Sequence, residues 1–128
     1  SGHDIGKAFA TDNGGAIPSN LLQIPNTESN SRYIAACKQL NLESHPARFP
    51  ARLPEFFIKM LTEPGDLVVD IFAGSNTTGE VAEQLQRRWL SFEIDRSYTA
   101  TSVFRFLPEA SEKELAGVHG QIIAGETV

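Results

Sequence analysis

Residues 66–95, DLVVDIFAGSNTTGEVAEQLQRRWLSFEID, contain two short apolar runs that flank a polar segment with helical periodicity. The first run leads through Asp70 into a turn at Gly74, and the second run ends at Glu93. Strands that are apolar on both faces are typical of buried parallel sheets. Because parallel strands need a crossover connection, the pattern predicts a strand, a helix and a second strand joined as a right-handed βαβ unit.

Helices are expected before this unit. Apolar residues recur at nearly helical spacing over 32–42. A second helix is predicted to begin at Pro54, which suits a first helical turn, and to end before residue 64. The residues expected to point inward and pack on the first strand are Phe57, Ile58, Met60 and Leu61.

Within the unit, Thr77 and Glu80 have the spacing of a capping box at the start of the central helix. Another helix is predicted over 98–106, followed by a weakly patterned stretch with a helix and a short strand. The chain therefore divides into a loop-rich lead-in, a core that contains the βαβ unit, and a C-terminal tail: 1–30, 31–106 and 107–128.

The bulk composition suits one ordinary soluble domain of 128 residues. No apolar run approaches the roughly 20 residues of a membrane-spanning helix, so we expect a cytoplasmic protein with no membrane contact. The chain has 16 acidic residues and 11 Lys and Arg, and this negative balance argues against binding of a nucleic acid backbone by this chain alone. The single cysteine, Cys37, excludes an internal disulfide and is expected to be a small buried residue on a helix, and no metal site is predicted.

The acids and the glycine turn indicate the class of ligand. In doubly wound sheets, ligands bind beyond the carboxyl ends of the strands, and an acid about 20 residues after the glycine turn binds the ribose hydroxyls. Glu93 has that spacing from Gly74.

A phosphate-binding loop would need a lysine next to Ser or Thr, and AGSNTTGE contains no basic residue. The Thr77 end of the helix suits a carboxylate and Asp70 an ammonium group, so the combination indicates S-adenosylmethionine. A dehydrogenase-like dinucleotide unit is the alternative, which predicts a further glycine where Asn76 stands.

Four segments resemble a known family, the amino-group DNA methyltransferases of bacterial restriction and modification systems, in the circularly permuted branch whose cofactor-binding part comes last. They are GGAIPSNLLQIPNTESN (14–30), HPARFP (45–50), DIFAGSNTTG (70–79) and RRWLSFEIDRSY (87–98). The first resembles the stretch that leads out of the catalytic and target-recognition part. The resemblance covers 14–106 and implies a partial Rossmann-like, S-adenosylmethionine-dependent methyltransferase fold of the α/β class, with an incomplete, mostly parallel sheet and flanking helices.

The resemblance also implies a cofactor site with three parts. The methionine end would be lined by Asp70, Phe72, Gly74, Ser75, Thr77 and Thr78. Glu93 would bind the ribose and Ile94 would pack on the adenine, while the other side would be closed by His45, Pro46, Ala47 and Phe49. The sequence departs from the usual Gly-Ser-Gly turn at Asn76, but Asn tolerates left-handed backbone better than other non-glycine residues.

The family's catalytic motif, a polar residue followed by two prolines and an aromatic, is absent, so no catalytic residue is assigned in this chain. We therefore expect the S-adenosylmethionine-binding portion of a site-specific DNA methyltransferase that modifies the exocyclic amino group of cytosine or adenine. DNA would be the substrate of the complete enzyme. This chain would be either part of a longer product or one subunit of a split enzyme. The chain alone should be inactive. The alternative is a decayed or truncated, non-catalytic module that serves only in binding or assembly.

The two predicted strands are apolar on both faces, and a two-stranded unit leaves at least one edge and one face open. We therefore expect self-association, with the tail or a second copy covering this surface; a complementary catalytic half is the alternative partner.

Overall fold

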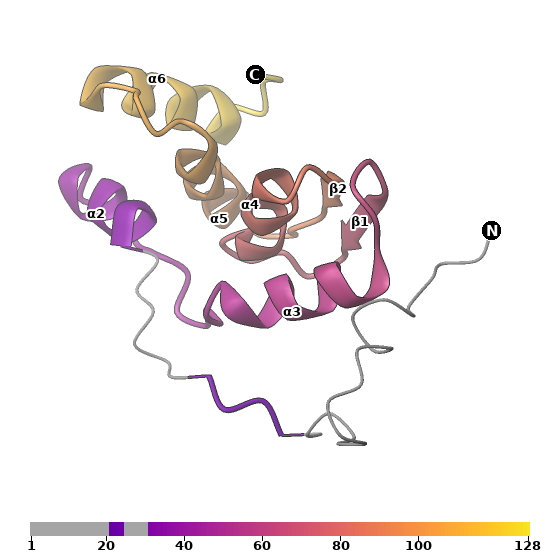
Figure 1. The fold of residues 1–128 in the computed structure, drawn as a ribbon. Helices are drawn as coiled ribbons and strands as arrows, with labels where there is room; N and C mark the ends of the chain where they lie inside the picture. Colours follow the sequence, from indigo (N-terminus) through magenta and orange to yellow (C-terminus); the bar gives the residue numbers. More distant parts are fainter. Residues whose placement is uncertain (1–20, 25–30) are drawn as a thin grey trace, which may run out of the picture.

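The computed structural model describes residues 21–24 and 31–128, so most of the predicted lead-in lies outside the described residues. Among the described residues, every helix is too short or too polar to traverse a lipid bilayer. The elements follow one another as α2 (Ser31–Gln39), α3 (Arg52–Leu61), β1 (Leu67–Asp70), α4 (Thr77–Gln84), β2 (Arg88–Ser91), α5 (Arg96–Ser102), the 3-10 helix η1 (Val103–Phe106) and α6 (Glu112–Ile123) (Figure 1).

The centre of the fold is the predicted strand, helix and strand unit. β1 and β2 pair in parallel, with Leu67 opposite Arg88 and Asp70 opposite Ser91, and α4 connects them. The prediction of two parallel strands joined by a helix is confirmed. On one side of the sheet, Ile58 of α3 and Val81 and Ala82 of α4 form a buried cluster, joined by partly buried residues of both strands.

The helix α3 differs from its prediction in two respects. It begins at Arg52 rather than at Pro54. Pro54 still lies in the first helical turn, where its missing N–H leaves no hydrogen bond unmade. Only Pro54 and Ile58 are buried, whereas Phe57 is 43% and Leu61 50% exposed. The expectation that both would pack inward is wrong, because the described sheet is too narrow to cover the whole apolar stripe of the helix.

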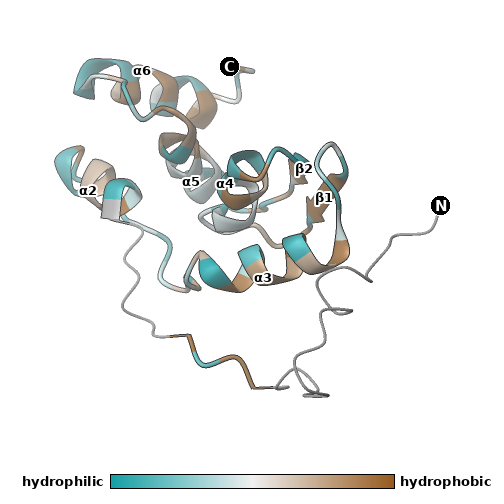
Figure 2. Cartoon of the chain, viewed as in Figure 1, coloured by the Kyte–Doolittle hydropathy of each residue, from teal (hydrophilic) through white to brown (hydrophobic). Residues whose placement is uncertain are grey.

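The second face of the sheet is apolar and exposed. Side chains alternate between the faces of a strand, and those pointing away from α4 are about half exposed: Leu67 (49%), Val69 (52%), Leu90 (48%) and Phe92 (51%). In Figure 2, β1 is drawn largely in the brown of hydrophobic residues. We call these four residues the open face. It corresponds to the uncovered face that the sequence predicts.

A second buried cluster joins α2 to the C-terminal helices and consists of Tyr33, Ala36, Cys37, Phe104 and Leu115. Cys37 is 1% exposed on α2, as predicted. In the predicted tail, α6 is capped by Ser111, whose hydroxyl accepts from the backbone of Glu114 while the Glu114 carboxylate accepts from Ser111. The predicted short strand is not formed. Because α6 packs on α5 (Figure 1), the tail does not cover the open face.

Candidate cofactor-binding site

The end of β2 is joined directly to the glycine turn that follows β1. Glu93 Oε2 accepts a hydrogen bond of 2.7 Å from the backbone N–H of Gly74, and Oε1 accepts one of 2.9 Å from Asp95. Gly74 has a left-handed φ of 55°, which glycine adopts without a Cβ clash. Asp70 Oδ1 accepts from the backbone of Phe72 at 2.9 Å. The structure thus brings the two acids and the turn to one edge of the sheet.

Asn76 takes the place of the expected glycine and also caps α4. Its φ of 61° is left-handed, and its Oδ1 accepts from Gly79 N at 3.0 Å and from Ser91 Oγ at 2.7 Å. The predicted cap at Thr77 is therefore wrong, because Thr77 is already helical and the capping side chain stands one residue earlier. Asn76 ties the turn to both α4 and β2.

His45 forms the facing wall of the site. A Cβ placed on Gly74 would lie 3.2 Å from His45 Nε2, so the turn approaches the imidazole as closely as a glycine permits. The ring packs edge-on against Tyr98, with 4.4 Å between centroids, and its Nδ1 lies 2.8 Å from the Ala47 carbonyl oxygen. The segment that begins at His45 and the glycine turn are therefore adjacent in space.

Between these walls lies an open cleft of ≈ 670 Å³, lined by His45, Ile71, Phe72, Phe92, Glu93 and Ile94. Phe72 and Ile94 are almost fully exposed there, at 84% and 102%. Four of the predicted site residues therefore line one cleft, with Gly74 in contact with two of them. The others have different environments: Ser75 and Thr77 are buried, Asp70 and Thr78 are half-buried, and Pro46, Ala47 and Phe49 are exposed beside His45.

Two residues behind the cleft were missed at the level of sequence, Arg105 and Tyr33. Arg105 is 4% exposed and lies 2.6 Å from the Glu80 carboxylate. Burial lowers the pKa of its guanidinium, and Glu80 opposes that effect. Tyr33 Oη accepts a 3.0 Å hydrogen bond from the backbone of His45, and burial raises the pKa of its phenol. One signal in the sequence could have indicated Arg105. It stands between Phe104 and Phe106, and an arginine that is buried between apolar residues needs an acidic partner.

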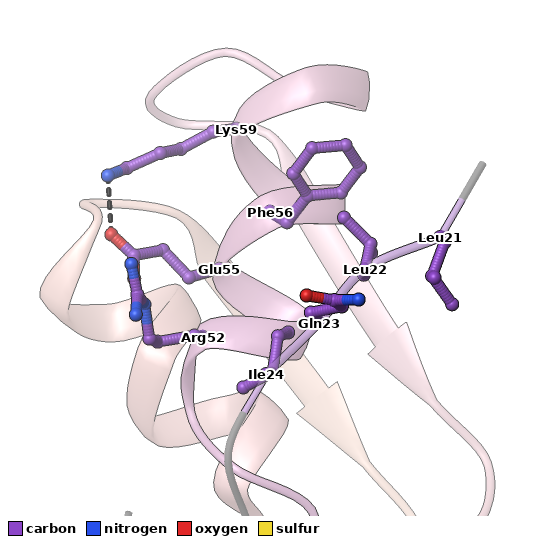
Figure 3. Close-up of a pocket in the computed structure, with 8 residues that line it drawn as sticks. All are labelled: Leu21, Leu22, Gln23, Ile24, Arg52, Glu55, Phe56 and Lys59. Atoms are coloured by element: carbon purple, nitrogen blue, oxygen red, sulfur yellow. Dashed lines mark hydrogen bonds and ion pairs between the residues drawn. The ribbon is translucent and has the colours of Figure 1, made fainter. Parts of the chain in front are cut away.

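A smaller depression of ≈ 390 Å³ lies where residues 21–24 cross α3 (Figure 3). Its charged residues are Arg52, Glu55 and Lys59, and the last two pair with each other at 2.5 Å. It therefore lacks the acid and turn combination of the first cleft. In the part of the chain that the structure describes, no group of His, Cys, Asp and Glu could hold a metal ion.

Comparison with known proteins identifies the family of the chain. The profile of a family described as DNA methylase matches residues 4–104. The type II methyltransferase M.PvuII of Proteus hauseri is 60% identical over 129 residues, covering 100% of this chain and 38% of that protein. The DNA adenine methyltransferase YhdJ of Escherichia coli (strain K12) is 34% identical over 104 residues, covering 80% of this chain and 33% of that protein.

A solved structure, described as PvuII DNA methyltransferase (cytosine-N4-specific), matches with a TM-score of 0.81 and 59% identity. It covers 86% of this chain, and the chain spans 39% of that structure. This match confirms the predicted partial α/β methyltransferase fold. Together, the family profile and these relatives show that the chain belongs to the amino-group DNA methyltransferase family.

Proposed function

We propose that this chain is the S-adenosylmethionine-binding portion of a site-specific DNA methyltransferase that modifies an exocyclic amino group. The observation that carries the proposal is the Glu93 carboxylate, which is tied to the glycine turn and lines the cleft that His45 closes. A carboxylate has about four lone-pair sites. The bonds from Gly74 and Asp95 use one site on each oxygen. One site on each oxygen is left, which suits the two adjacent hydroxyls of a ribose.

The other parts of the cleft suit the rest of the cofactor. Ile94 and Phe72 present exposed apolar surface on which an adenine could pack. The amino end of α4 follows the turn directly, and its dipole favours a carboxylate. When bound, S-adenosylmethionine would supply the methyl group that the amine of the base takes up as the sulfonium becomes a thioether. The residues of this chain would hold and orient the cofactor for that transfer.

Cytosine is the favoured base. The PvuII structure at 59% identity is described as cytosine-N4-specific, whereas YhdJ, described as an adenine methyltransferase, is 34% identical. DNA would be the substrate of the complete enzyme. The chain has no Pro-Pro pair with which to hold the base, so it should be inactive alone.

We assign the open face to a complementary polypeptide that carries the catalytic motif, either in the same product or as a second subunit. This chain spans 38% of M.PvuII, so most of that relative has no counterpart here. The open face consists of large apolar side chains that are each about half exposed, as expected for a surface that another part of a fold covers. The lack of a Pro-Pro pair also supports a second candidate function, a non-catalytic module that binds without turnover.

The test is calorimetric titration of the chain with S-adenosylmethionine. Glu93→Ala should weaken binding about 10-fold or more, because losing hydrogen bonds to a charged group costs about 1.4 kcal/mol or more. Glu109→Ala removes an exposed carboxylate outside the cleft and should leave the affinity unchanged. Binding of NAD that is tighter than binding of S-adenosylmethionine would contradict the proposal, as would robust methylation of DNA by the chain alone.

A further inference from the structure

Arg105 forms an ion pair that neutralises its charge, and it also donates hydrogen bonds to the glycine turn. A buried charge is costly unless it is paired and hydrogen-bonded, and Glu80 at 2.6 Å provides the pair. Two further donors go to a single residue. Nε donates to the Ser75 carbonyl oxygen at 2.5 Å and Nη2 donates to Ser75 Oγ at 2.9 Å. The planar guanidinium therefore fixes both the backbone and the side chain of Ser75.

Ser75 is the middle residue of the turn, which includes one non-glycine residue with left-handed backbone. It lies between Gly74 and Asn76, whose φ angles of 55° and 61° are both left-handed. Such backbone persists where the surrounding structure over-determines it. Both neighbours are held by the bonds described above, to the end of β2 and to α4. Arg105, which comes from η1, holds the residue between them.

The same guanidinium is connected to the opposite wall of the cleft through Tyr33. The Arg105 Cζ lies 4.5 Å from the centroid of the Tyr33 ring, within the range of a cation–π interaction. Tyr33 Oη in turn accepts the hydrogen bond from the His45 backbone. The two walls of the cleft are therefore linked twice. The His45 ring lies directly against Gly74, and Arg105 and Tyr33 connect Ser75 to the His45 backbone from the buried side.

We propose that Arg105 is a positioning residue for cofactor binding, which sets the Ser75 turn against the His45 segment from behind the cleft. It is 4% exposed and so acts through the turn rather than by contact with the ligand. This inference rests on the proposed function, because the ligand that the turn receives is taken to be S-adenosylmethionine.

The decisive variant is Arg105→Lys. Lysine keeps the charge that Glu80 needs, but its single ammonium cannot hold both Ser75 acceptors and lie flat on Tyr33. Calorimetry with S-adenosylmethionine should show an affinity about 10-fold lower, the fold-change expected for losing one hydrogen bond to a charged group. Amide hydrogen exchange of residues 74–77 should accelerate, and this readout needs no ligand.

Glu80→Gln is the matched control, since it weakens the ion pair and leaves the bonds from Arg105 to Ser75 in place. It should lower thermal stability with little change in affinity or in exchange at 74–77. If both variants lose stability in parallel while affinity and exchange in the folded protein stay unchanged, Arg105 is merely structural and the proposal is overturned.

Two further outcomes are decided by the same measurements. If Arg105→Lys fails to fold, Tyr33→Phe is the second variant. It removes the hydroxyl that accepts from the His45 backbone and that also lies 3.3 Å from Thr101 Oγ1, and it should weaken binding in a folded protein. An unchanged affinity for Tyr33→Phe would then overturn the link between the walls. If the unsubstituted chain binds no S-adenosylmethionine, the proposed function fails, while exchange at 74–77 still shows whether Arg105 holds the turn.

Discussion

Gly79→Ala should destabilise the protein although alanine is the better helix former. A Cβ at this position would lie 2.5 Å from Oδ1 of Asn76, a distance that no relaxed contact allows. The Asn76 side chain would have to move, and it is the acceptor for both Gly79 N and Ser91 Oγ. The substitution therefore breaks the cap of α4 and the tether to β2 together.

The magnitude follows from three opposing terms. Alanine in place of glycine in a helix contributes about 1 kcal/mol of stability. Loss of a helix N-cap costs about 0.5–2 kcal/mol, and loss of the Ser91 bond costs about 0.5–1.5 kcal/mol. Their balance is a decrease of about 1 kcal/mol in the free energy of unfolding.

Urea unfolding followed by circular dichroism measures this change, provided that the slope of the transition is unchanged. Gly117 of α6 is the matched control, because nothing lies within 4 Å of a Cβ placed there, and Gly117→Ala should stabilise by about 1 kcal/mol. Adding Asn76→Gly to Gly79→Ala should recover part of the loss, since the clash disappears and glycine tolerates the φ of 61°. If Gly79→Ala stabilised the protein as much as Gly117→Ala, the argument would be refuted.

Two further predictions concern the open face and α6. Val69→Lys should abolish capture of this chain by a polypeptide that spans the uncovered part of M.PvuII, whereas Val128→Lys, at a position 62% exposed near the C-terminus, should not. Sedimentation of the chain alone provides the contrary outcome, since dimerisation that Val69→Lys abolishes would assign the face to a second copy. The hydrogen bonds from the Ser111 backbone and hydroxyl lower the pKa of Glu114. The stability from a lowered pKa is present above the unfolded-state value, ordinarily 4.5, and is lost as the pH falls through the folded-state value. Urea midpoints measured from pH 6 down to about 3 should therefore depend less on pH in Glu114→Gln than in the unsubstituted chain, and identical profiles would contradict this assignment.

The βαβ unit was predictable because its signals are local. Apolar runs, the turn at Gly74 and the spacing to Glu93 all lie within 66–95, and the parallel pairing of the two strands follows from them. Helix boundaries were predicted less well. Thr77 and Asn76 both suit a cap, and Asn76 is the cap because helical backbone begins at Thr77.

The supporting contacts could not be predicted because they depend on distant parts of the chain. The sequence pattern assigns Glu80 to a capping box and gives no partner for Arg105, and only the fold brings the two together. Phe57 and Leu61 show the opposite limit: a helical apolar stripe predicts a buried face, but not how much of that face the neighbouring strands can cover.

The contact between Tyr33 and the C-terminal helices also sets the order in which the site can form. The hydrogen bond between the hydroxyls of Tyr33 and Thr101 joins residues 68 positions apart, and the entropy of closing such a loop must be overcome before the contact is gained. The glycine turn and Glu93 can meet early, within one local unit, but the His45 wall is fixed only when η1 has been synthesised and has docked on α2. We therefore expect the cleft to be completed after the βαβ unit during synthesis, and a cofactor that needs both walls would bind only chains that extend through Phe106.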